Sequence, residues 1–87
     1  MIITGMEDFQ SVCKNRLVGT YNKMFSDRHI NLDNVFIVWA CKTLQNYKAL
    51  ASTTVEGDGV YVEYTYNGDR QELYEDVYIK RLNTKYE

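Results

Sequence analysis

The hydrophobic positions of this chain follow a helical period first and a strand period afterwards. From residue 6 onward, apolar side chains recur at steps of three and four, the spacing of one face of an α-helix. Thr4 and Glu7 have the spacing of a capping box, so we predict a helix that begins here and frays between Phe25 and Arg28. Its apolar stripe consists of Phe9, Val12, Cys13, Leu17, Tyr21 and Met24.

Three stretches rich in β-branched and aromatic residues follow a turn-rich segment at 26–34. We predict strands at 35–43, 48–54 and 60–66, with turns at 44–47 and 55–59. The third strand alternates between apolar and more polar residues, which is typical of a strand with one buried face. Its apolar face consists of Val60, Val62, Tyr64 and Tyr66.

The first of these strands is apolar on both faces. A strand of this kind must be covered on both sides, by a helix, a loop or another chain. If Phe36 and Val38 are covered by a second copy, the protein is a homodimer. Alternation places Val35, Ile37, Trp39 and Cys41 on one face and Phe36, Val38 and Ala40 on the other.

The segment 69–82 fits two structures. Asn67-Gly68 often joins two strands, so the segment can be read as a fourth strand. The spacing of Asp69 and Glu72 and a stripe at i, i+1, i+4 and i+5 fit a helix better, and we predict a helix here. The stripe consists of Leu73, Tyr74, Val77, Tyr78 and Leu82.

The predicted architecture is a single α+β domain over residues 1–87. Its element order is α-β-β-β-α, with a three-stranded antiparallel sheet packed by the N- and C-terminal helices. A content of 45% hydrophobic and 14% aromatic residues indicates a folded chain rather than a disordered one. A net charge of −2 gives no basic field for general nucleic-acid binding.

Cysteine usage and hydropathy point to a soluble protein of the cytoplasm. Cys13 and Cys41 lack the spacing of a metal or redox motif, so we interpret both as buried intracellular thiols, with a single disulfide as the alternative. No stretch approaches the roughly 20 apolar residues of a membrane span, and no signal peptide is evident. We therefore expect no membrane partner.

The sequence offers little for catalysis. The only histidine, His29, lies in a turn-rich segment and is best explained as a solvated loop residue. Glu56 and Asp58 lack the repeated ligand spacing of a calcium loop, and turn chemistry explains them. We expect no enzyme activity, no catalytic or metal-binding residues and no cofactor.

Tyrosine is the one compositional excess, with eight in the chain. Tyrosine is enriched in protein interfaces because it combines apolar area with a polar end. We expect some rings to be exposed and to form a contact surface for another protein, although tyrosines at the edge of an ordinary core remain an alternative. The predicted contact residues are Tyr47, Tyr61, Tyr64 and Tyr66.

Nucleic acid is the alternative partner, because the αβββα order is also that of double-stranded-RNA-binding domains. Lys42, Tyr47 and Lys48 surround the first predicted turn and could contact a phosphate or stack on a base. Against this reading, acids rather than lysines gather where the last predicted helix begins, namely Asp69, Glu72, Glu75 and Asp76.

Three strings in the chain support a resemblance: Val38-Trp39, the run from Cys41 to Asn46, and the run from Tyr64 to Asp69. Over residues 34–78 the chain resembles a family of small proteins, of unknown function, encoded by phages and prophages of Gram-positive bacteria. The resemblance implies a phage accessory protein in the bacterial cytoplasm that binds a host protein and inhibits or redirects it. It implies no reaction, cofactor or binding residue.

Overall fold

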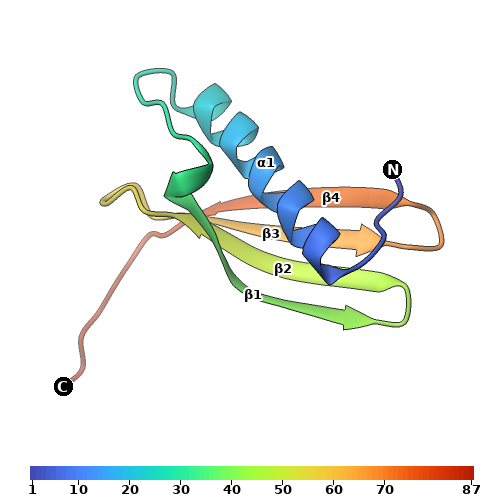
Figure 1. Ribbon diagram of the computed structural model, residues 1–87. Helices are drawn as coiled ribbons and strands as arrows, with labels where there is room; N and C mark the ends of the chain where they lie inside the picture. The colour runs from blue at the N-terminus through green and yellow to red at the C-terminus, as the bar shows by residue number, and fades with distance from the viewer.

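The computed structural model describes all 87 residues, and one long helix precedes four strands (Figure 1). Helix α1 spans Met6–Met24 and the short 3-10 helix η1 spans Leu32–Asn34. The strands are β1 (Val35–Thr43), β2 (Asn46–Thr53), β3 (Val60–Asn67) and β4 (Glu72–Ile79).

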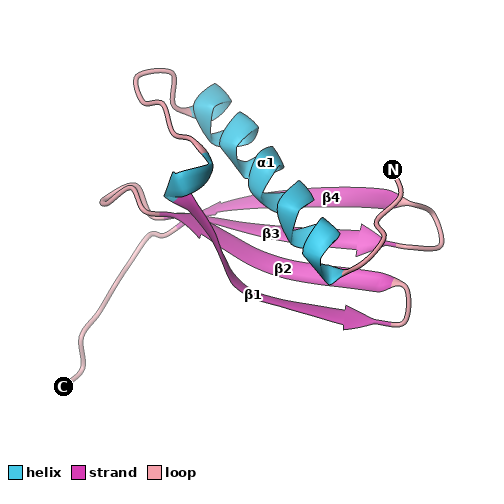
Figure 2. Cartoon of the chain, viewed as in Figure 1, coloured by secondary structure: helices cyan, strands magenta, loops and turns pink.

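The strands form one antiparallel sheet in the order β1-β2-β3-β4, and α1 lies across one of its faces (Figure 2). The predicted α+β class is confirmed, as is the N-terminal helix. Two further expectations are wrong, because the sheet has four strands rather than three and the chain has no C-terminal helix. The αβββα order that suggested a double-stranded-RNA-binding domain is therefore not formed.

The segment 69–82, predicted as a helix, forms a turn and the edge strand β4 instead. Leu73 and Val77 are four residues apart, so they lie on the same side of the chain in a strand as well as in a helix. The side chain of Asn67 accepts hydrogen bonds from the amides of Asp69 (3.0 Å) and Arg70 (3.2 Å), which closes a turn where the helix was expected to begin. The backbone then pairs with β3 along its whole length.

Helix α1 begins near the predicted position, but the hydrogen bonds at its start differ from the predicted capping box. Its N-cap residue is Gly5, which has no side chain to cap with. The Asp8 carboxylate, not Glu7, accepts from the amide (2.9 Å) and the hydroxyl (3.2 Å) of Thr4. The helix ends at Met24, one residue before the segment from Phe25 to Arg28 where fraying was predicted.

The hydrophobic core lies between α1 and the sheet. Ala49 and Ala51 of β2 are fully buried, and their small side chains let the helix approach the sheet closely. The four buried helix residues are Phe9, Cys13, Leu17 and Tyr21, and they pack in one cluster with the inward residues of β2 and β3. The predicted apolar face of β3 is confirmed, since Val60, Val62, Tyr64 and Tyr66 are all buried.

Strand β1 has the predicted bounds, but a β-bulge changes which residues share a face. The register moves from Ile37 opposite Ala51 to Trp39 opposite Leu50, so Val38 has no partner of its own. Ala40 therefore packs toward the core, and Trp39 lies on the face away from α1. The predicted alternation assumed a regular strand and is wrong from Trp39 onward.

The two cysteines lie on opposite sides of the sheet and are both free thiols. Cys13 lies on the inward side of α1 and is buried, as predicted. Cys41 is exposed, because it follows the bulge in β1 and shares the outer face with Trp39. The expectation of two buried thiols is therefore wrong for Cys41, and no disulfide is formed.

The loop between β2 and β3 is fastened to the end of α1 through Asp58. The Asp58 side chain is only 4% exposed, and it accepts hydrogen bonds from the Tyr21 hydroxyl (2.5 Å) and the Val60 amide (3.1 Å). The guanidinium of Arg28 lies 3.6 Å from the same carboxylate. Asp58 thus has a tertiary role beyond the turn chemistry expected of it.

Candidate functional site

The sheet face that points away from α1 carries no covering element, and we call it the open face (Figure 2). Residues reach it by strand alternation, because successive side chains of a strand point to opposite faces. Its large apolar side chains, which we call the aromatic patch, are Phe36, Trp39, Leu50, Tyr61, Tyr74 and Tyr78.

Five members of the aromatic patch are neighbours across the strands, and Tyr74 lies further along β4, separated from Tyr78 by Asp76. Tyr61 and Tyr78 are directly opposite each other in the register of β3 and β4. Trp39 and Leu50 are opposite each other in that of β1 and β2. Trp39 is 45% exposed and Tyr78 is 53% exposed, so both rings offer apolar area to a partner. Contiguous exposed apolar area of this kind marks interaction sites on soluble proteins.

Acidic groups surround the aromatic patch. The open face carries three carboxylates, Glu63, Glu72 and Asp76, and one ammonium group, Lys48, which amounts to a formal charge of −2. The Lys48 ammonium lies 3.0 Å from Glu63, so its charge is already paired. Glu72 lies 3.9 Å from the guanidinium of Arg70 in the turn before β4, so Asp76 is the one carboxylate of this face outside an ion pair. The remaining charge is negative, which favours a basic partner surface and disfavours phosphate.

Three of the four tyrosines predicted as contact residues are core residues. Tyr64 is fully buried and Tyr47 and Tyr66 are almost so. The Tyr47 ring stacks on Phe9 with centroids 5.1 Å apart. The Tyr66 hydroxyl donates to the carbonyl of Met1 (2.9 Å). Only Tyr61 lies on the open face, so the predicted set does not form one surface.

The residues of the alternative nucleic-acid site are also separated. The Lys42 ammonium lies over the Tyr47 ring at 5.7 Å from its centroid, on the side of the sheet that faces α1. Lys48 lies on the open face beside Glu63. Because the two lysines lie on opposite faces and Tyr47 is buried on the face of Lys42, no common phosphate contact is formed.

Sequence reasoning missed most of the aromatic patch for two identifiable reasons. Trp39 was assigned to the wrong face because the bulge at Val38 leaves no signal in the alternation. Tyr74 and Tyr78 were assigned to a helix stripe. The alternation of Leu73, Glu75, Val77 and Ile79 with the intervening tyrosines was the available signal for β4.

A group of polar side chains lies between α1 and β4, lining a hollow of about 270 Å³. The Glu75 carboxylate accepts from the hydroxyls of Tyr64 (2.5 Å) and Thr20 (2.8 Å), and Arg16 lines the same hollow. Burial raises the pKa of Tyr64, and the hydrogen bond to Glu75 raises it further. Burial, with the nearby charge of Glu75, also raises the pKa of Cys13 to about 12. Cys13 therefore stays a protonated thiol near neutral pH.

These shifts predict that the protein loses stability in alkaline solution. The folded state holds the protons of Cys13 and Tyr64 more tightly than the unfolded state does. Their stabilising contribution is therefore complete below pH 9.0, the ordinary pKa of the thiol, and declines above it. We expect the urea midpoint to fall between about pH 8 and about pH 10.5. The fall should be smaller in Cys13→Ala and unchanged in Cys41→Ala. An equal fall in both variants would contradict this assignment.

No group of three or more His, Cys, Asp or Glu side chains is arranged to hold a metal ion. None of the helices has the length and apolar character needed to cross a membrane. A family model described as a family of unknown function (DUF6275) matches residues 10–87. No curated protein and no solved structure matches the chain.

Proposed function

We propose that this chain, which belongs to the DUF6275 family, a family of unknown function, is a non-enzymatic protein-binding domain. The proposal rests on the geometry of the chain. The binding surface is the open face. The observation that carries the proposal is the aromatic patch, in which Trp39, Tyr74 and Tyr78 are each about half exposed on an uncovered sheet.

The chemistry of the open face specifies the kind of partner. Aromatic rings supply apolar contact area at a low cost in conformational entropy, and they dominate the energetic centres of protein interfaces. The carboxylates of Glu63, Glu72 and Asp76 lie among these rings. A partner surface with an apolar centre and flanking Lys or Arg residues therefore matches both features.

The biological context comes from the resemblance of residues 34–78 to phage and prophage proteins of Gram-positive bacteria. In that context the partner is a protein of the bacterial host or of the phage, met in the cytoplasm. Binding through a broad flat face acts by occlusion, so the bound protein is inhibited or redirected. The contact residues are those of the aromatic patch, with Tyr61 the one member shared with the residues expected from sequence.

A nucleic acid is the second candidate ligand, because exposed rings on a sheet can stack on unpaired bases. The negative charge of the open face opposes it. A complex driven by phosphate contacts weakens steeply with rising salt, whereas a complex driven by the aromatic patch depends on salt only weakly. A salt titration of the captured complex therefore separates the two candidates.

Partner capture with matched variants tests the proposal. Wild-type protein, Trp39→Ala and Met24→Ala are immobilised and exposed to a Gram-positive lysate. Both replaced side chains are about half exposed, but Met24 lies at the end of α1, on the other side of the sheet. We expect a protein that the wild type and Met24→Ala retain and that Trp39→Ala binds at least about 10-fold more weakly.

Folding of the variants is checked by circular dichroism, so that a loss of binding can be assigned to the surface. Equal retention by Trp39→Ala and the wild type would contradict the proposal. Recovery of nucleic acid alone would contradict it as well and favour the second candidate.

A further inference from the structure

Strand β4 leaves one edge of the sheet unpaired. Its register with β3 runs from Asn67 opposite Glu72 to Val60 opposite Ile79 without a bulge. The amide of Lys80 continues this ladder by donating to the carbonyl of Gly59 (2.9 Å). Because amide direction alternates along a strand, the backbone groups of Glu75, Val77 and Ile79 point toward the free edge. An unbulged edge of this length is a template for another strand.

The sequence around this edge has opposite charges at equal distances from Tyr78. Val77 and Ile79 flank it on either side, and next come Asp76 and Lys80. Glu75 and Arg81 follow, and then the apolar side chains Tyr74 and Leu82. Two antiparallel copies of such a segment, centred on the same residue, place each acid opposite a base and each apolar side chain opposite an apolar one.

We propose that β4 pairs antiparallel with β4 of a second copy of this chain, centred on Tyr78. Asp76 then faces Lys80 of the second copy and Glu75 faces its Arg81, each pair occurring twice by symmetry. Val77 faces Ile79 of the second copy. These two residues are among those whose backbone groups point outward, so the pairing also supplies their missing hydrogen bonds.

Neighbouring registers do not satisfy the same groups. Centring on Val77 places Asp76 opposite Tyr78 and leaves the carboxylate of Glu75 opposite Ile79. Centring on Asp76 places the Asp76 carboxylates of the two copies opposite each other, which is destabilising. Centring on Ile79 places Asp76 opposite Leu82. Only the register centred on Tyr78 matches charge with charge and apolar with apolar.

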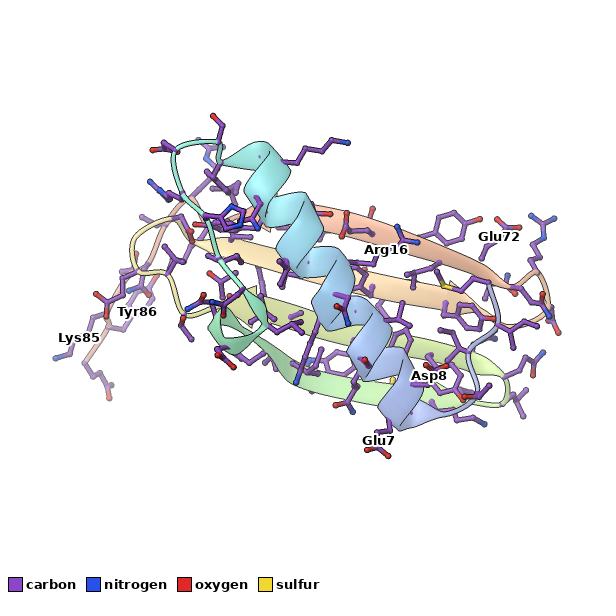
Figure 3. The ribbon with its side chains drawn as sticks, turned by 45° about the horizontal axis from the view of Figure 1, so that its top comes forward. Glu7, Asp8, Arg16, Glu72, Lys85 and Tyr86 are labelled. Atoms are coloured by element: carbon purple, nitrogen blue, oxygen red, sulfur yellow. The ribbon has the colours of Figure 1, made fainter.

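The segment after β4 is available for this pairing. Residues 80–87 lead away from the sheet, and Lys85 and Tyr86 lie well beyond it in Figure 3, whereas Glu72 lies at the opposite end of the edge strand. Leu82 is 80% exposed. Pairing with a second copy would order residues up to Leu82 and join two four-stranded sheets into one, with both aromatic patches on the same face.

A charge-swap series tests the inference by sedimentation equilibrium on the full chain. We expect the wild type to dimerise. Asp76→Lys and Lys80→Asp should each weaken the dimer by about 10- to 100-fold, because each places two pairs of like charges in opposition. The double variant Asp76→Lys with Lys80→Asp should recover the dimer, because every opposing pair is again of opposite sign. Glu7→Lys, on the exposed first turn of α1, is the control for the change in net charge.

Ile79→Pro is a second test that leaves the charges unchanged. The Ile79 amide points outward, so proline removes an edge donor while keeping the ladder with β3, and we expect a folded monomer. A wild type that stays monomeric at every concentration would overturn the inference. So would a dimer that tolerates the single charge variants, or one that the double variant fails to recover. These outcomes are independent of the proposed function, whose capture experiment concerns Trp39.

Discussion

Replacing Tyr64 with alanine is expected to lower the free energy of unfolding by about 3–5 kcal/mol. Tyr64 is fully buried on β3, one of the two inner strands, where its ring belongs to the core beneath α1. Truncation leaves a cavity that the close approach of helix and sheet prevents from collapsing. Such a loss is a large part of the roughly 5–15 kcal/mol by which domains are stable, so much of the variant should be unfolded.

Tyr64→Phe is the matched control, because it keeps the ring and removes only the hydroxyl that donates to Glu75. It should lower the free energy of unfolding by about 0.5–1.5 kcal/mol, since water can solvate the exposed carboxylate that loses its donor. Urea unfolding followed by circular dichroism measures both values. If Tyr64→Ala were as stable as Tyr64→Phe, the ring would lie at the surface, as the sequence interpretation proposed.

Replacing Asp58 with alanine should lower the free energy of unfolding by about 2–3 kcal/mol. The variant leaves the buried hydroxyl of Tyr21 and the amide of Val60 without their acceptor. Burial and the hydrogen bond to Asp58 both raise the pKa of Tyr21, so this hydroxyl stays neutral and needs an acceptor. Asp58→Asn keeps one acceptor oxygen where the carboxylate has two, so it can accept from only one of the two donors, and its loss should be smaller, about 1–2 kcal/mol.

A double-mutant cycle with Tyr21→Phe checks the assignment of this effect. If the hydroxyl and the carboxylate act as a pair, the two single losses are not additive, and their coupling energy is about 1–2 kcal/mol. Additive losses would show that Asp58 acts on the loop alone, without fastening it to α1.

The helix and the first three strands could be predicted because local pattern and tertiary structure agree there. Four of the six residues of the predicted α1 stripe are buried, Met24 at its end being exposed, and the alternation of β3 coincides with its inward face. In β4 the alternation is present but weaker, and a helical stripe fits the same residues. At the sheet edge its inward positions include Glu75, whose carboxylate accepts from Tyr64, so the alternation is interrupted by a charge that only the folded structure explains.

The contact tyrosines were misassigned for a different physical reason. The expectation rested on the view that so small a core cannot accommodate many phenol hydroxyls. Tyr64 and Tyr66 show how it does so, since their rings are buried while their hydroxyls reach Glu75 and the carbonyl of Met1 at the margins of the core. Tyrosine count alone therefore does not separate core from surface, and the fourth strand enlarges the core that receives them.

The binding role of the open face is tested most directly by fluorine NMR at Trp39, the only tryptophan in the chain. Protein labelled with 5-fluorotryptophan gives a single resonance, which reports on the β1 side of the aromatic patch. On titration with the partner retained by the wild type, we predict that this resonance shifts or broadens until the complex is saturated. A resonance that stays unchanged in the saturated complex would contradict the assignment of the open face as the binding surface.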